Sequence, residues 1–314
     1  MKFYRIAVAL LAAQFAFGAA QGAHAYSVTT VGTGGVDATA MANALLAPGG
    51  GITINSATYD PGVTPPGGDQ ASGIFTGGTS IHNLFNQGVV LTTGSASTFG
   101  SNANGLPGYS PLQNLNGGAS TFDASILDIT FTPTGSTVGF NYVFGSAEYP
   151  TFVGSTFNDV FAFFVNGISP GNNVALIPGT TTPVAINNIN CGGLVPPFTG
   201  PFCNEFVDNR NGDKGLAFNP FDTASGGLGG WTDVFNVVAS VTPNVENELI
   251  LAIADTSDEF NDSAVFIQSG SFGVVCAPGE AGCGLSVPEP AALLLLGPGL
   301  AGLAGLAWRR SRRK

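Results

Sequence analysis

The chain has 314 residues, of which 46 are Gly and 20 are Pro, and only 9% are charged. This much Gly and Pro excludes a helical bundle or a coiled coil, while the 44% apolar content argues against a wholly disordered chain. Only two of the nine basic residues, Arg210 and Lys214, lie between positions 26 and 287, together with 19 acidic residues. This acidic interval disfavours nucleic-acid binding, which depends on Lys and Arg side chains.

The N-terminal segment has the three parts of a secretory signal peptide. Lys2 and Arg5 form a basic region, residues 6–17 form an apolar region, and Ala23 and Ala25 frame an A-x-A cleavage site. The apolar run is shorter than the roughly 20 residues that span a bilayer, which disfavours a first membrane anchor. We therefore expect a signal peptidase to remove residues 1–25 during export.

One helix and several strands are expected in the domain predicted over residues 26–286. Asp37 is placed to cap a helix over 38–46, and Pro48 and the glycines that follow it would end this helix. Strand patterns follow as apolar alternations or short apolar runs between turn residues. They cover residues 88–93, 126–131, 137–144, 160–165, 232–241, 248–254 and 263–275. Long segments rich in Gly, Pro, Asn and Ser predict surface loops over 59–79, 98–119 and 191–230.

These strands predict an all-β fold, a jelly-roll-like two-sheet β-sandwich with long loops and one short N-terminal helix. Eight aromatic side chains are expected to fill its centre, because each strand of a sandwich needs one apolar face. A sugar-stacking platform is the alternative interpretation of these rings. They are Phe140, Tyr142, Phe144, Phe152, Phe157, Phe161, Phe163 and Phe164.

Four cysteines in an exported chain predict two disulfides, for which three pairings are open. We favour Cys191 with Cys203 and Cys276 with Cys283, because each pair closes a short loop that has no other covalent constraint. A zinc site is the rival interpretation, but the chain has no Cys-x2-Cys spacing.

The sequence provides no recognisable catalytic constellation. His24 leaves with the signal peptide, so the mature chain keeps His82 alone, and no Gly-x-Ser-x-Gly motif is present. Nucleophilic catalysis with a histidine base and histidine-based zinc hydrolysis are therefore disfavoured. We expect no enzyme activity and no catalytic residue, with a carboxylate-pair glycoside hydrolase as the remaining alternative.

Four carboxylates lie within eight residues between two predicted strands: Asp255, Asp258, Glu259 and Asp262. They repel one another unless solvent or a cation screens them. Calcium suits such a turn because it binds six to eight oxygen atoms, although the spacing of an EF-hand loop is absent. We predict a calcium site with Asp255, Asp258 and Asp262 as its principal ligands.

A second acidic pair, Glu148 and Asp159, brackets another loop between two predicted strands. In a sandwich the two acidic loops can meet at one end, so both side chains are further candidate calcium ligands. The alternative for all of these carboxylates is a solvated acidic rim with no bound metal.

The C-terminal segment, residues 287–314, contains Pro288-Glu289-Pro290, then the apolar stretch 291–308, then five basic residues within 309–314. The apolar stretch predicts a transmembrane helix with a cytoplasmic basic end. This order resembles the PEP-CTERM sorting signal of Gram-negative bacteria. The resemblance implies cleavage by an exosortase-type enzyme after transient anchoring in the inner membrane, and delivery to the cell surface or the extracellular matrix. A plain membrane anchor is the alternative.

Five stretches within 28–275 follow a common family pattern. They are GVVLTTGS at 88–95, FNYVFGSAEYP at 140–150, FNDVFAFF at 157–164, DSAVF at 262–266 and GSF at 270–272. Through them most of this interval resembles the choice-of-anchor L domain of bacterial surface proteins. The family pattern usually has a second acidic residue where Ala147 stands, but Glu148 is retained. The resemblance implies surface display and supplies no catalytic residue.

Together these features predict a non-catalytic adhesive or structural protein of the cell surface or biofilm matrix, with calcium as a candidate stabilising ion. Its partners would be a signal peptidase, an exosortase, and exopolysaccharide or other surface proteins. A lectin-like exopolysaccharide-binding module is the first alternative, with Tyr109 and Trp231 as candidate exposed aromatic residues. A secreted glycoside hydrolase is the second.

Overall fold

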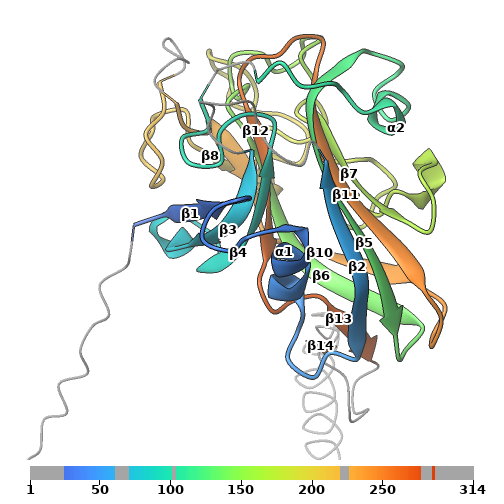
Figure 1. The fold of residues 1–314 in the computed structure, drawn as a ribbon. Helices are drawn as coiled ribbons and strands as arrows, with labels where there is room; N and C mark the ends of the chain where they lie inside the picture. The colour runs from blue at the N-terminus through green and yellow to red at the C-terminus, as the bar shows by residue number, and fades with distance from the viewer. Residues whose placement is uncertain (1–24, 61–70, 101–103, 220–225, 277–284, 287–314) are drawn as a thin grey trace, which may run out of the picture.

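The computed structural model describes residues 25–60, 71–100, 104–219, 226–276 and 285–286. These residues form two β-sheets that face each other, with the helix α1 (Ala38–Leu45) beside strands of both sheets (Figure 1). The all-β two-sheet sandwich that the strand patterns predict is thus confirmed. Residues 1–24 of the expected signal peptide 1–25 and the expected sorting segment 287–314, including the expected transmembrane helix 291–308, lie outside the described residues.

The larger sheet has ten strands. They are β1 (Ser27–Thr30), β3 (Ser72–Thr76), β4 (Gln87–Thr92), β6 (Thr137–Ser146), β8 (Phe206–Asp208), β9 (Gly230–Thr232), β10 (Phe235–Ser240), β12 (Ser263–Gln268), β13 (Gly273–Cys276) and β14 (Leu285–Ser286). The sheet has the order β1-β3-β4-β12-β6-β13-β14, while β10 and β9 also pair with β6, and β8 pairs with β9. The pairing of β13 with β14 is parallel, and the other pairings in this sheet are antiparallel.

The smaller sheet has four antiparallel strands in the order β2-β5-β11-β7. They are β2 (Ile52–Asp60), β5 (Thr121–Pro133), β7 (Val160–Val165) and β11 (Asn247–Thr256). β7 is buried along its whole length, as its continuous apolar run predicts, because both of its faces are covered. A short helix, α2 (Ser110–Gln113), lies beside β5, β7 and β11.

The core lies between the sheets, where aromatic rings of β6 meet those of β7. Tyr142 contacts Phe161 and Phe163 with ring centroids 5.3 and 5.0 Å apart, and Phe140 contacts Phe163 at 4.9 Å. Phe144 stacks on Phe161 at 5.1 Å. For these five rings the core interpretation is correct.

Three of the eight predicted core rings lie elsewhere. Phe164 alternates with Phe163 along β7 and packs into a separate apolar cluster on the outer face of the smaller sheet. Phe152 and Phe157 pack against each other at 5.4 Å in the loop before β7 and are only partly buried. The prediction fails for this pair because both rings belong to a loop and therefore have no strand face to share.

The early helix follows the predicted signals. The Asp37 carboxylate accepts a hydrogen bond from the Ala40 N–H at 2.7 Å, which caps the helix. Met41 and Leu45 lie on the buried face, four residues apart. The helix ends one residue earlier than expected, because Leu46 has an extended backbone.

Other predicted boundaries need correction. The strand expected over 263–275 is two strands, β12 and β13, separated by a turn in which Gly270 has a φ of +70°. The region 59–79, expected to be a loop, contains the end of β2 and all of β3. Among the described residues, no helix is both long and apolar enough to cross a membrane.

Candidate functional site

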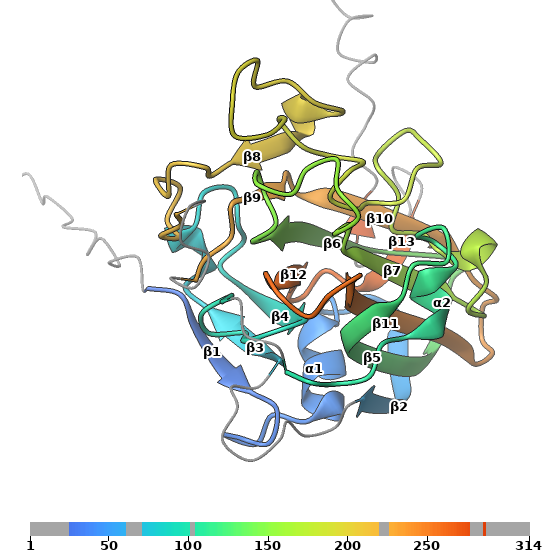
Figure 2. The same cartoon turned by 90° about the horizontal axis from the view of Figure 1, so that it is seen from above.

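Ends of strands β4, β5, β6, β7, β11 and β12 lie at one end of the sandwich, the upper end in Figure 1. Antiparallel register brings these strand ends together, although they are far apart in the sequence. Seen from above, the loop between β11 and β12 passes over this end (Figure 2). The paired positions at this end are Thr92 with Ala264, Ser146 with Ser263, Thr121 with Thr256, and Val160 with Ala254.

The alternation of side chains along these strands directs carboxylates inward. On β11, Leu251 and Ile253 belong to the core, so Asp255 also faces the space between the sheets. On β7, which pairs with β11 in the same sheet, Phe161 belongs to the core. Asp159 lies two residues before Phe161 and therefore on the same side of the sheet. At this end of the sandwich, carboxylates therefore take the inward-facing positions that apolar side chains occupy in the core.

Five carboxylates form what we call the acidic cluster. Each of these five residues is at most 1% exposed, so the carboxylates are buried and do not form a solvated rim. Its members are Asp123, Glu148, Asp159, Asp255 and Asp262. Asp258, predicted as a principal calcium ligand, stays partly exposed and accepts a hydrogen bond from the Phe260 N–H at 3.3 Å.

Two members of the cluster have hydrogen-bond partners for both carboxylate oxygens. Asp159 accepts hydrogen bonds from the Thr256 N–H at 2.9 Å and from the Ser263 hydroxyl at 2.6 Å, and thereby joins β11 to β12. Asp123 accepts hydrogen bonds from the N–H groups of Asn104 and Leu106.

Asp123 reaches the cluster because of an irregularity in β5. The β5–β11 register shifts between Ile253 and Asp255, and Asp123 has a φ of +48°. A β-bulge of this kind redirects a side chain from its regular direction. Strand alternation alone does not predict this, and the sequence analysis accordingly missed Asp123.

The other three members have buried oxygen atoms without a partner. Both carboxylate oxygens of Glu148 and of Asp255 lack a hydrogen bond, as does Oδ1 of Asp262. Oδ1 of the neighbouring Asn261, which is 6% exposed, is also unpartnered. Oδ2 of Asp262 accepts the Ser95 N–H at 3.1 Å. Six buried oxygen atoms at this end therefore have no donor.

No positive side chain neutralises the cluster. Within residues 25–286 the sequence contains only Arg210 and Lys214 as Arg or Lys residues, and these pair with Asp208 and Asp213. Buried charges without a counter-ion are costly, because the interior solvates them poorly.

Burial accordingly raises the pKa values of these carboxyl groups. Burial and the charges of Asp159 and Asp258 raise the pKa of Glu148 to about 10. The nearby Asn261 side chain acts in the opposite direction and lowers this pKa. Burial, followed by the charge of Asp159, raises the pKa of Asp255 well above its ordinary value. The cluster must therefore bind either protons or a cation near neutral pH.

The pKa values of Asp262 and Asp159 are raised less than that of Glu148. Burial raises the pKa of Asp262 to about 8, opposed by the Ser95 N–H. Burial raises the pKa of Asp159 to about 7, opposed mainly by the hydrogen bonds from Ser263 and Thr256. Hydrogen-bond donors thus separate Asp159 from Glu148 and Asp255, which have none.

Gly94 lets the main chain approach Asp262 closely. A Cβ atom at Gly94 would lie 1.8 Å from Oδ2 of Asp262, so no larger residue fits without moving this carboxylate. The Asp262 main chain is also fixed, because its carbonyl accepts the Ala147 N–H at 2.9 Å and its N–H donates to Gly100 at 3.1 Å. Sequence reasoning missed Gly94 because nothing local marks this long-range contact.

No three His, Cys, Asp or Glu side chains among the described residues already form a metal-binding group. A cation at the acidic cluster would therefore need amide or main-chain carbonyl oxygens in addition to carboxylates. Calcium accepts such mixed sets of oxygen ligands in flexible geometries.

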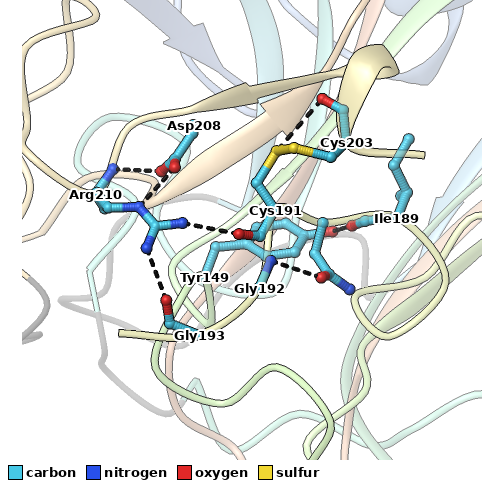
Figure 3. Close-up of a disulfide and its surroundings, with 9 residues drawn as sticks. Tyr149, Ile189, Cys191, Gly192, Gly193, Cys203, Asp208 and Arg210 are labelled. Carbon is cyan, nitrogen blue, oxygen red and sulfur yellow. Dashed lines mark hydrogen bonds and ion pairs between the residues drawn. A yellow bond between two sulfur atoms is a disulfide. The ribbon is translucent and has the colours of Figure 1, made fainter. Parts of the chain in front are cut away.

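A second polar region surrounds the disulfide (Figure 3). Cys191 and Cys203 are bonded, as predicted, with their Cα atoms 4.7 Å apart. The Arg210 side chain bonds to Asp208 through Nε at 2.6 Å and donates to the carbonyls of Gly193 and Cys191 at 2.7 and 3.1 Å. We call this arrangement the Arg210 clamp. Cys283, the predicted partner of Cys276, lies outside the described residues.

The two aromatic residues proposed for sugar stacking differ. Trp231 is 1% exposed and its Nε1 donates to the His82 carbonyl at 2.9 Å, so it is not available on the surface. It is buried because β9 lies between β8 and β6. Tyr109 is partly exposed, and its pKa is raised by burial and by the charges of Asp128 and Glu248.

Two family models match the chain. One, described as the choice-of-anchor L domain, covers residues 30–273, and the other, described as the PEP-CTERM protein-sorting motif, covers residues 286–313. The first match includes the whole acidic cluster and the Arg210 clamp, and the second includes Pro288-Glu289-Pro290. Comparison with curated proteins and with solved structures finds no match.

Proposed function

This chain belongs to the choice-of-anchor L family and carries a PEP-CTERM sorting motif, and we propose that it is a non-catalytic adhesive or structural module. The sorting motif implies export and exosortase processing in a Gram-negative-type bacterium. The chain is thus an exosortase-sorted surface protein. The observation that carries the proposal is the succession of one large sandwich domain and a sorting motif.

In this proposal a signal peptidase cuts after Ala25, and residues 291–308 hold the exported chain transiently in the inner membrane. The exosortase then cleaves near Pro288-Glu289-Pro290 and delivers the domain to the cell surface or the extracellular matrix. There the domain would contact exopolysaccharide or other surface proteins.

The surroundings of His82 support a non-catalytic role. His82 is exposed, and among the described residues no hydrogen bond involves its imidazole ring. A histidine that activates a Ser or Cys nucleophile lies within hydrogen-bond distance of it. The buried carboxylates of the acidic cluster are likewise enclosed by loops, which does not favour access by a polysaccharide chain.

We further propose that calcium stabilises the exported domain at the acidic cluster. Support comes from five buried carboxylates without a basic partner in residues 25–286. Sites in extracellular modules bind calcium with dissociation constants of roughly 10⁻⁴ to 10⁻³ M, so even a weak site would serve a secreted protein.

Sorting and display can be tested in cells that express the full chain. Glu289→Ala is expected to retain the chain in the inner membrane with the Arg309 to Lys314 tail attached, as measured by fractionation and by mass spectrometry of the C-terminal peptide. Glu280→Ala, a change of an acidic residue outside the motif, is the control. Normal processing of Glu289→Ala would contradict the proposed route.

The adhesive or structural role needs its own measurement. Cells with the unprocessed Glu289→Ala chain should form less cohesive aggregates or matrix than cells with the wild-type or the Glu280→Ala chain. Equal cohesion in all three would remove support for this role while leaving the sorting result intact.

One observation favours a lectin-like module as the second candidate. Tyr109 lies on the outer face of the smaller sheet with the acidic side chains of Asp128 and Glu248 near it. An aromatic ring beside polar groups can stack on a sugar and hydrogen-bond to its hydroxyls. Binding of the full chain to a glycan array that Tyr109→Ala abolishes would favour this candidate, and release of reducing sugar would favour a hydrolase.

A further inference from the structure

We infer that Glu148, Asp255, Asn261 and Asp262 supply the side-chain ligands of a calcium site, while Asp123 and Asp159 position them. The inference rests on the proposed calcium-stabilised domain and names the residues that hold the ion. It changes the ligand set expected from the sequence, because Asn261 replaces Asp258 and Asp159 becomes a positioning residue.

The number of unpartnered oxygens matches the chemistry of calcium. Glu148 and Asp255 each contribute two, and Asn261 and Asp262 each contribute one, which makes six buried oxygen atoms without a hydrogen bond. Calcium binds six to eight oxygens, often with bidentate carboxylates. In native proteins nearly all buried polar atoms have a partner, so unpartnered oxygens on four residues at this end of the sandwich favour a cation as their partner.

Hydrogen bonds show that these groups are neighbours in space. Asp159 accepts hydrogen bonds from Thr256, next to Asp255, and from Ser263, next to Asp262. The Asp262 carbonyl accepts the N–H of Ala147, next to Glu148. The charge of Asp159 accordingly acts on Glu148, on Asp255 and on Asp262, the charge of Asp262 acts on Asp255, and the Asn261 side chain acts on Glu148. The unpartnered oxygens therefore belong to residues that lie close to Asp159.

Asp159 and Asp123 have a different role because their oxygens already accept hydrogen bonds from the protein. Asp159 holds Thr256, next to the ligand Asp255, and Ser263, next to the ligand Asp262. Asp123 holds the loop at Asn104 and Leu106. Such outer groups fix the ligands in place and add negative charge near the ion.

The ligand chemistry selects calcium among common cations. The four side chains offer oxygen only, whereas zinc prefers His nitrogen and Cys sulfur. Magnesium requires near-ideal octahedral geometry and usually keeps several water ligands, which a buried site with many protein oxygens does not favour. A mixed set of three carboxylates and one amide suits calcium.

The site would connect the two sheets. Glu148 follows β6 and Asp262 precedes β12, both in the larger sheet, whereas Asp255 lies on β11 in the smaller sheet. A bound ion would therefore join the sheets at their loop-bearing end. Without the ion, repulsion among the same carboxylates would act to separate them.

The test uses the full chain purified in detergent, stripped with chelator and titrated with calcium chloride in a calorimeter. We expect one calcium per chain for the wild type, and binding weakened by at least about tenfold in Asp255→Asn and in Glu148→Gln. Asn261→Gly is expected to weaken binding too, because Asn261 has a φ of +64° that Gly adopts freely, so only the ligand is lost.

Asp128→Asn is the matched control. Oδ1 of Asp128 is also buried and unpartnered, but Asp128 lies on the outer face of the smaller sheet, away from the cluster. This variant should bind calcium within about twofold of the wild type. A parallel magnesium chloride titration should show much weaker binding.

Thermal melts in chelator show whether each variant is folded when calcium is absent. Asp255→Asn should melt at a higher temperature than the metal-free wild type, because the amide cannot ionise beside Asp159, and should lose the rise that calcium gives the wild type. No binding by the wild type at about 5 mM calcium would overturn the inference and the proposed calcium stabilisation together.

A different result would overturn the inference alone. If the wild type binds calcium and if Asp255→Asn, Glu148→Gln and Asn261→Gly all bind it equally well, the ion lies elsewhere and the proposed stabilisation stands. Loss of binding in Asp128→Asn as well would also contradict the assignment. The adhesive and sorting assays are independent of each of these outcomes.

Discussion

The Arg210 clamp and the acidic cluster both keep charged groups out of solvent, but only the clamp is complete. Arg210 satisfies its nitrogens with Asp208 and two carbonyls, and its guanidinium carbon lies 3.9 Å from the centre of the Phe198 ring. The acidic cluster has no basic neighbour within residues 25–286, and together with Asn261 it has six buried oxygens without a donor among the described residues.

The difference between a paired and an unpaired buried charge indicates where a ligand binds. A charged group with an opposite charge and a hydrogen bond from each of its nitrogens is explained as part of the fold, as Arg210 is where it holds the disulfide loop. Buried carboxylates without partners cost roughly several kcal/mol each, which a protein retains only when something else neutralises them. We therefore expect pH and calcium to change the stability of the acidic cluster and to leave the Arg210 clamp unaffected.

The largest expected effect is a loss of stability of the metal-free chain as pH rises. Asp159, Asp262 and Glu148 have pKa values raised to about 7, 8 and 10, while the unfolded chain has values near 4. The native state thus holds protons that the unfolded chain has released. This stabilisation is present below about pH 4 and is lost as pH rises through 7 to 10.

Urea unfolding in chelator at pH 5, 7 and 9 measures this loss, which should reach several kcal/mol because one pKa unit corresponds to about 1.4 kcal/mol. Saturating calcium should reduce the loss at pH 7 and 9. Stability that rises between pH 5 and 9 in chelator would contradict the description of the acidic cluster as uncompensated.

Removal of the disulfide should have the next largest effect. Replacing Cys191 and Cys203 by Ala frees a loop closed over a separation of 12 residues and should cost about 3 kcal/mol of unfolding free energy. Chemical denaturation under oxidising conditions measures it. Wild type treated with reductant serves as the comparison, and calcium affinity should not change, since the acidic cluster is built from other strands.

Gly94→Ala should affect the acidic cluster instead. Its Cβ would lie 1.8 Å from Oδ2 of Asp262, so the carboxylate must move, and overpacking of this kind costs about 1–3 kcal/mol. Calcium binding should weaken in parallel. Gly171→Ala is the control, because its Cβ would meet nothing within 4 Å. Equal calcium affinity of Gly94→Ala and wild type would show that Asp262 is not held as described.

The smallest effect is expected from Arg210→Lys. Lys keeps the charge but cannot reach Asp208 and both carbonyls with one planar group, so about 1–2 kcal/mol should be lost. Lys214→Met, which removes the exposed pair with Asp213, should change stability by less than about 0.5 kcal/mol. Thermal melts compare the two, and faster proteolysis within 192–202 should appear in Arg210→Lys only.

Local signals predicted several elements well. The Asp37 cap, the doubly buried run 160–165 and the short-range pair Cys191 with Cys203 each depend on residues close together in the sequence. The sequence also indicated that the two acidic loops can meet at one end, and hydrogen bonds join them in the structure, from the Ser257 hydroxyl to the Thr156 carbonyl and from the Ala147 N–H to the Asp262 carbonyl. In these cases spacing and residue type carry most of the information.

The failures share a different cause. Trp231 was a candidate exposed aromatic residue for the lectin-like alternative, yet pairing of β9 with β6 and β8 buries it. Asp123 was overlooked because a bulge turns it toward the cluster, and Asp258 is partly exposed although it lies only three residues from the buried Asp255. Each depends on contacts with strands far away in the chain.

By itself the sequence determined the sorting motif, the all-β class and the acidic interval, because these follow from composition and from short ordered motifs. Strand alternation also determined that Asp255 shares a face with Leu251 and Ile253. Only the tertiary structure decided that carboxylates from five separate segments meet between two sheets without a basic partner. The reason is that antiparallel register between distant strands sets these distances, and no local pattern contains it.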